Sequence, residues 1–86
     1  MKVVSLNNVR VRFPDNPEDW GQIQRWLYIF IEMITTKEVV VREIAQKTGL
    51  TAPSVYYIMN RLGLPVVQLK AGVWSVLRLE DEHYDE

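Results

Sequence analysis

The side chains best suited to bind a ligand through directional bonds lie between positions 51 and 61 of the sequence, TAPSVYYIMNR. Thr51 and Ser54 carry hydroxyl groups, while Asn60 carries an amide and Arg61 a guanidinium. Hydroxyl groups and cations bind phosphate oxygens, whereas an amide or a guanidinium can pair with the edge of a nucleic-acid base. These residue types favour recognition by hydrogen bonds over the making or breaking of covalent bonds.

Catalytic and metal-binding chemistry has little support in the sequence. The single histidine, His83, lies in an acidic stretch, and the chain has no cysteine. Asp81, His83 and Asp85 could hold a metal ion only weakly, because they form no rigid ligand set. We find neither a glycine-rich phosphate loop nor a serine paired with a base. We therefore expect a protein that is not an enzyme and that has no cofactor and no metal.

Charge is distributed unevenly along the chain. The formal net charge is −1, but five of the 11 acidic residues lie in residues 80–86, EDEHYDE. Residues 1–79 carry ten basic and six acidic side chains, a formal charge of +4. We expect the segment 80–86 to be a disordered, solubilising tail; the alternative is that it competes with an anionic ligand for the basic surface.

The length and composition favour one small domain in a reducing compartment. A chain of 86 residues is most often a single domain, and without cysteine it has no disulfide framework. No apolar run approaches the roughly 18 residues that span a bilayer, and the N-terminus lacks the pattern of a signal peptide. We expect a soluble, cytoplasmic protein.

Residues 1–13 have the pattern of β structure. Apolar residues alternate with Arg10 and Arg12, which is the period of a half-buried strand. The pair Asn7-Asn8 separates two apolar runs, and asparagine tolerates the positive φ of a tight turn. This β arm is either one bent strand or a hairpin, with both arginines on one face.

A helix is predicted over residues 17–36. Asn16 suits the N-cap and Pro17 the first helical position, and Gly21 then falls inside the helix. The apolar surface of this helix is wider than the face that a monomer needs to bury. The expected core stripe consists of Trp20, Ile23, Leu27, Phe30, Ile31 and Ile34.

Three further apolar residues, Trp26, Ile29 and Met33, extend that stripe around one edge of the helix. Two interpretations remain open. Either the N-terminal strands cover these residues, or they form the interface of a homodimer, since large exposed apolar patches usually mark interfaces.

Residues 41–62 have the capping and packing pattern of two short helices joined by a tight turn. Gly49 supplies the positive φ that ends the first helix, and Thr51 caps the second. Pro53 fits the first turn of that second helix. Its buried face is predicted from the spacing of Val55, Ile58, Met59 and Leu62.

Residues 66–79 follow as two β-rich runs, 66–69 and 73–79, on either side of a turn that contains Gly72. Lys70 is expected near the tip of this hairpin and Trp74 in the core. Both faces of the second run are partly apolar, so we expect one face to meet the helices and the other to meet a neighbour.

The stretch from Val39 to Leu79 resembles the winged helix-turn-helix DNA-binding superfamily, and the helix before it fits the usual preceding helix. The residues that carry the resemblance are Ile44, Ala45, Gly49, Leu50, Val55 and Ile58. Two positions depart from the pattern. Val40 or Val41 stands where a polar cap is usual, and Thr48 replaces an apolar residue.

The resemblance implies an α+β fold, a winged helix-turn-helix with three helices, a C-terminal β-wing and an N-terminal strand or hairpin. It also implies sequence-specific binding of double-stranded DNA by a transcriptional regulator, with the second helix of the motif in the major groove. From the wide apolar surface of the helix 17–36 we expect this regulator to act as a homodimer. The expected DNA contacts are Arg42, Lys47, Thr51, Ala52, Pro53, Ser54, Tyr56, Tyr57, Asn60, Arg61 and Lys70.

A rival interpretation is a winged-helix module that binds a protein and has no DNA target. Tyr56, Tyr57 and the low positive charge favour it, because tyrosine is enriched at protein interfaces. In a third alternative, one of these tyrosines is partly buried against the wing.

Overall fold

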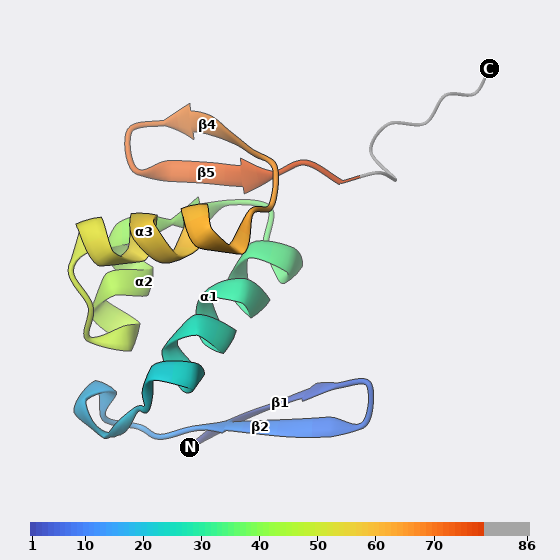
Figure 1. The fold of residues 1–86 in the computed structure, drawn as a ribbon, viewed down its shortest axis with the longest axis vertical. Helices are drawn as coiled ribbons and strands as arrows, with labels where there is room; N and C mark the ends of the chain where they lie inside the picture. Colours follow the sequence, from blue (N-terminus) through green and yellow to red (C-terminus); the bar gives the residue numbers. More distant parts are fainter. Residues whose placement is uncertain (79–86) are drawn as a thin grey trace.

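The computed structural model describes residues 1–78, and Figure 1 shows their arrangement. The predicted tail 80–86 and its weak metal ligands lie outside the described residues. The chain is α+β, with three helices and antiparallel strands, as predicted. In chain order the elements are β1 (Lys2–Leu6), β2 (Val9–Phe13), a 3-10 turn η1 (Pro17–Asp19), α1 (Gln22–Thr35), β3 (Val39–Val40), α2 (Val41–Thr48), α3 (Ala52–Leu62), β4 (Val66–Lys70) and β5 (Val73–Val76).

The N-terminal arm is a hairpin, which decides between the two predicted forms. β1 and β2 pair antiparallel, and the turn residues Asn7 and Asn8 have φ values of 50° and 69°. Arg10 and Arg12 are exposed on one face of the hairpin, as predicted, and they share that face with Ser5 and Val3, their partners in β1. The other face packs against α1.

The first helix begins later than predicted, at Gln22 instead of residue 17. Pro17–Asp19 forms a separate 3-10 turn, which Asn16 does not cap with its side chain. Gly21 is extended and lies just before α1, so the prediction that it falls inside the helix was wrong.

Trp20 explains this break between η1 and α1. Its indole is 5% exposed, its Nε1 donates a hydrogen bond to the Pro14 carbonyl (2.7 Å), and its ring packs 5.1 Å from Phe13 and 5.2 Å from Tyr28, centroid to centroid. A continuous helix would move this ring out of the cluster. The α1 helix begins instead at Gln22, and at its start the Gln24 Oε1 atom accepts a hydrogen bond from the Gly21 amide (2.6 Å).

The predicted dimer interface on α1 was wrong for two of its three residues. Ile29 and Met33 are fully buried within the single chain, in a core shared with α2, α3 and the sheet, and Trp26 packs partly against that core. Conversely Ile23, a predicted core residue, is 75% exposed, and Leu27 is only half-buried.

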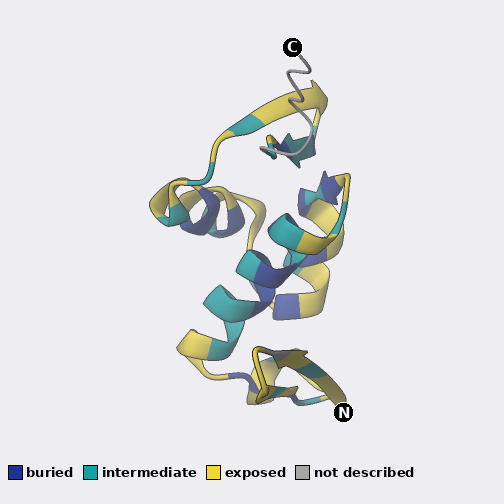
Figure 2. Cartoon of the chain, turned by 90° about the vertical axis from the view of Figure 1, so that its right-hand side faces the viewer, coloured by how far each residue is buried: buried dark blue, intermediate teal, exposed yellow. Residues whose placement is uncertain are grey.

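The reason is that α1 carries three apolar stripes. One faces the other helices, and a second, with Tyr28 and Ile31, faces the hairpin. The third, with Ile23, Leu27 and Phe30, has only partial cover. Figure 2 shows the buried side of α1 turned toward the other helices.

The two short helices form as predicted. Gly49 ends α2 with φ 75°, and the Thr51 hydroxyl caps α3 by accepting a hydrogen bond from the Ser54 amide (3.3 Å). Thr48, the unusual polar residue, is fully buried, and its hydroxyl donates a hydrogen bond to the Ile44 carbonyl (2.7 Å). The predicted buried face of α3 is confirmed, with Val55, Ile58 and Met59 buried and Leu62 half-buried.

The C-terminal strands form a three-stranded antiparallel sheet in the order β3-β5-β4. The strand β5 ends at Val76 and not at residue 79, so the predicted second run was too long. Arg78 then turns back toward α1. Its Nη2 donates hydrogen bonds to the carbonyls of Thr36 (3.0 Å) and Met33 (3.4 Å), where the negative end of the α1 dipole favours a cation.

No helix in residues 1–78 is long and apolar enough to cross a membrane.

Candidate nucleic-acid interface

The outer face of α3 carries the predicted recognition residues. Because Val55, Ile58 and Met59 fix the buried side of the helix, the residues on the other side stay accessible. Pro53 and Asn60 lie two turns apart on the most outward stripe. The exposed residues of the predicted set on α3 are Ala52, Pro53, Tyr56, Tyr57, Asn60 and Arg61.

The turn between β4 and β5 is held against the start of α2. The Val41 amide, which has no side-chain cap, donates a hydrogen bond to the Gly72 carbonyl (3.0 Å). The pairing of Val40 with Val73 adds a second link between these segments. The valine at the cap position is therefore compensated by the backbone of the wing turn.

This link places two predicted cations around the wing turn. Arg42 and Lys70 line one hollow of about 550 Å³ beside Gly72. Arg42 also lines a neighbouring hollow of about 480 Å³ together with Ala52 and Tyr56 of α3. The two hollows share Arg42 and Gly72, so the start of α2 and the wing turn lie beside Ala52 and Tyr56 of α3.

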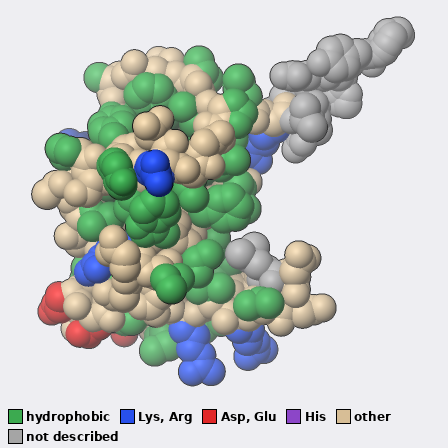
Figure 3. All heavy atoms as spheres, in the orientation of Figure 1, with side chains coloured by type: hydrophobic (Ala, Val, Ile, Leu, Met, Phe, Trp, Pro, Cys, Tyr) green, Lys and Arg blue, Asp and Glu red, His purple; other side chains and the backbone are tan. Residues whose placement is uncertain are grey.

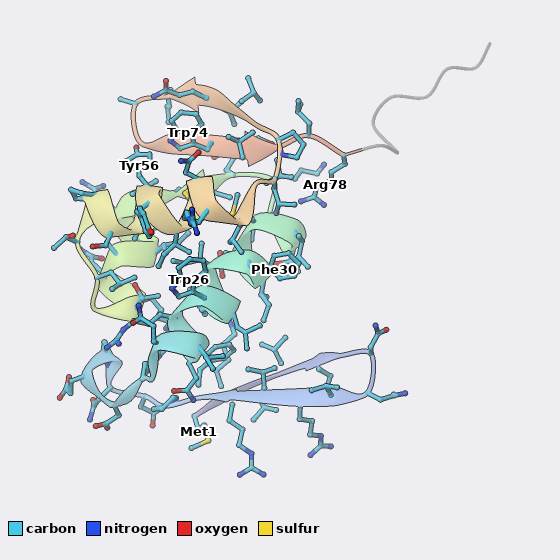
Figure 4. All side chains as sticks on the ribbon, viewed as in Figure 1. Met1, Trp26, Phe30, Tyr56, Trp74 and Arg78 are labelled. Carbon is cyan, nitrogen blue, oxygen red and sulfur yellow. The ribbon has the colours of Figure 1, made fainter. Side chains whose placement is uncertain are left out.

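Tyr56 connects α3 to the wing. Its hydroxyl accepts a hydrogen bond from Trp74 Nε1 (3.2 Å), and the two rings meet edge to face with centroids 6.0 Å apart. Figure 4 shows Trp74 above Tyr56, between the sheet and α3. Tyr56 is 37% exposed, and Trp74, which was predicted in the core, is half-buried and packs against the core. The hydroxyl of Tyr56 keeps its own proton to donate to a ligand oxygen.

Tyr57 leans the other way, toward α1. Its ring meets Trp26 edge to face with centroids 6.5 Å apart, and it is 59% exposed. Tyr56, Tyr57 and Asn60 also line a groove of about 650 Å³ between α3 and the wing, with Trp74 on its far wall.

The hydroxyls at the start of α3 are already partly used. Thr51 Oγ1 donates a hydrogen bond to Ser54 Oγ (3.0 Å) while it accepts one from the Ser54 amide. Ser54 still carries a hydroxyl proton, so it can donate to a phosphate oxygen near the positive end of the helix dipole.

Not every predicted cation lies at this surface. Lys47 lies at the opposite end of α2 from Arg42, near Asp15. The N-terminal amine is the main cause of the lowered pKa of the Asp15 carboxyl, and Lys47 adds a smaller effect. Arg10 and Arg12 lie on the outer face of the hairpin, at the end of the molecule away from the wing. Three cations of the predicted set, Arg42, Arg61 and Lys70, therefore remain near α3 and the wing.

Two further basic residues serve the fold. Arg25 Nε donates a hydrogen bond to the Thr48 carbonyl (2.8 Å) and its Nη2 to the Pro17 carbonyl (3.0 Å), while Arg78 caps α1. Neither role was predicted, because the carbonyl partners lie 8, 23 and 42 residues away along the chain.

The visible face over α3, α1 and the wing is rich in hydrophobic side chains, with few cations, in Figure 3. No group of three or more metal-ligating side chains gathers within residues 1–78. No model of a known protein family, no curated protein and no solved structure matches the chain.

Proposed function

We propose that this protein binds double-stranded DNA as a winged helix-turn-helix and regulates transcription as a homodimer. In this proposal α3 enters the major groove and the turn between β4 and β5 lies on the adjacent backbone. The observation that carries the proposal is the pair of hollows around Gly72: Arg42 lies beside Ala52 and Tyr56 of α3 in one, and beside Lys70 and Glu38 in the other. Helix-turn-helix proteins use the amino-terminal half of the second helix against base edges.

Exposed side chains along the whole of α3, and not only those of its amino-terminal half, suit contacts with bases or phosphates. The Asn60 amide is able to pair with an adenine, and Arg61 with a guanine or a phosphate. Ala52 and Pro53 can meet a thymine methyl group. The hydroxyls of Ser54 and Tyr56 can donate to phosphates.

The electrostatic contribution of a single copy to DNA binding is modest, so two copies are better suited to bind than one. If Arg42, Arg61 and Lys70 each neutralise one phosphate, the logarithm of the binding constant falls with the logarithm of the salt concentration with a slope of about −3. A dimer doubles that slope and the number of bases that are read.

Two substitutions separate base recognition from backbone contact. We expect Asn60→Ala to relax sequence preference in a selection from random duplexes, because one good base contact provides about 1–3 kcal/mol of discrimination. We expect Lys70→Ala to weaken binding to all duplexes alike. An equal loss across sequences for both variants would contradict the role of Asn60.

A protein-binding module is the second candidate, and the outer face of the wing favours it. Val67 and Leu69 of β4 are 43% and 50% exposed, and Leu77, just after β5, is 52% exposed, which is a large apolar surface for so small a region. If the protein retards no duplex even at low salt, where electrostatic attraction is strongest, this second function replaces the first.

A further inference from the structure

An apolar stripe of α1 lies open at the surface. Ile23 is 75% exposed, and Trp26 and Phe30, which are half-buried, lie on the same helix (Figure 4). With Leu62 from the end of α3, these side chains form a shallow groove of about 540 Å³. The residues that line it are Gln22, Ile23, Trp26, Leu27, Phe30 and Leu62.

None of the lining residues is charged. The two charged residues of α1 point elsewhere, since Arg25 bonds to the carbonyls of Thr48 and Pro17, and Glu32 lies beside Tyr28. A two-fold axis brings a surface against its own copy, so a charged groove would bury like charges. An uncharged apolar groove meets its copy without that penalty, whereas it offers nothing to a phosphate backbone.

We propose that this groove, together with the adjoining face of the hairpin, is the seam of a homodimer, in which α1 packs against α1 of a second copy. This inference deepens the proposed function by naming the surface that joins the two copies. It replaces the interface predicted from the sequence and keeps only Trp26 of it.

The area that a stable dimer needs explains why the hairpin belongs to the seam. Each partner of a standard interface buries roughly 800 Å², about one eighth of the 6092 Å² accessible surface of this chain. One face of a helix with 14 residues falls short of that area. The hairpin supplies the remainder: on the strand face where Val11 packs against the cluster of its own chain, Val9, nearer the turn, is 60% exposed and open to a partner. Figure 1 shows the hairpin extending past α1 toward its turn.

The seam also fits the orientation of the DNA-binding surface. Leu62 is the last residue of α3, so a two-fold axis at the groove holds the carboxyl ends of the two α3 helices near the axis. The amino ends, with Arg42 and Lys70 beside them, lie farther out. Dimeric helix-turn-helix proteins need such separation to reach half-sites one turn of DNA apart.

The test is the mass of the full chain in solution without DNA, measured by light scattering and sedimentation from low to high micromolar concentration. We expect a dimer for the unmodified chain and at least about tenfold weaker self-association for Ile23→Glu, which would bury a charge in the seam. Because Ile23 is 75% exposed, this variant should keep its circular dichroism spectrum. Leu69→Glu is the matched control, since Leu69 is an exposed apolar residue of the wing and should not affect the dimer.

Three results would overturn the seam: an unmodified chain that stays monomeric at every concentration, an unchanged dimer in Ile23→Glu, or dissociation caused by Leu69→Glu. The outcome is independent of DNA binding. A monomer that still binds duplexes refutes the seam alone, and a dimer that binds none refutes the proposed function alone.

Discussion

The indole Nε1 of Trp74 donates a hydrogen bond to the hydroxyl of Tyr56 at 3.2 Å, which ties the wing to the exposed face of α3. One residue of the candidate reading helix thus also fixes the position of the wing. Any ligand that contacts Tyr56 meets a side chain whose orientation is already set, so less rotamer entropy is lost on binding.

The substitution Tyr56→Phe tests whether the Tyr56 hydroxyl stabilises the fold. Removal of the hydroxyl leaves the Trp74 indole without its partner, and we expect a loss of about 0.5–1.5 kcal/mol in the free energy of unfolding. Tyr57→Phe is the matched control and should lose less, because the contact of Tyr57 with Trp26 is between rings. Urea denaturation measures both, and equal losses would show that the Tyr56 hydroxyl has no special role.

Gly49 should tolerate substitution less well than Gly63. Both have φ 75°, a conformation that costs other residues about 1–2 kcal/mol. A Cβ at Gly49 would also lie 3.0 Å from the Pro17 Cβ, whereas nothing lies within 4 Å at Gly63. Thermal melting should therefore show a larger decrease for Gly49→Ala than for Gly63→Ala. The reverse order would mean that η1 does not pack against the turn as described.

Arg25 is expected to stabilise the fold and to have no direct part in ligand binding. Its two charge-assisted hydrogen bonds join α1 to η1 and to the end of α2. We expect Arg25→Ala to lower the free energy of unfolding by about 1.5–3 kcal/mol, and Arg12→Ala, at an exposed site on the hairpin, to change it little. Denaturant titration of the two variants provides the comparison. A similar small effect for both would contradict the role of Arg25.

Ionisation of Tyr28 should lower the free energy of unfolding in alkali. Burial raises the pKa of Tyr28 from 10.0 to about 12, with Glu32 adding to the shift. The neutral phenol is favoured in the folded state, so this contribution is complete below pH 10 and is lost as the pH rises toward 12.

The measurement for Tyr28 is the free energy of unfolding between pH 9 and 12, compared with Tyr28→Phe, as the pKa window requires. The variant should lose less stability over this range, because its ring does not ionise. Parallel pH profiles would place the cause of any alkaline instability elsewhere.

Much of the helical hairpin could be predicted from the sequence, because its signals are local. The positive φ of Gly49, the cap at Thr51 and the spacing of Val55, Ile58 and Met59 each act within one turn of helix. The two strands β4 and β5 on either side of Gly72, and the hairpin turn at Asn7-Asn8, follow from equally local patterns, whereas the pairing of β3 with β5 does not.

Long-range contacts decide what could not be predicted. The predicted orientation of α1 was wrong, because the helix carries three apolar stripes and the periodicity of the sequence does not tell which stripe contacts which neighbour. The cap of Val41 comes from the Gly72 carbonyl, and Arg78 reaches the carbonyls of Thr36 and Met33. Lys47, which sequence reasoning had grouped with Arg42 and Lys70, lies instead near Asp15 at the other end of α2.

The salt dependence of duplex binding tests the proposed DNA surface most directly. Fluorescence anisotropy should give a slope of about −3 per copy for the unmodified protein, and the variant Arg42→Gln/Lys70→Gln should reduce its magnitude by about 2. The matched control Arg10→Gln/Arg12→Gln removes the same charge from the far end of the molecule and should keep the slope. A control variant that loses as much slope as the first, or an unmodified protein that binds no duplex at low salt, would contradict the account.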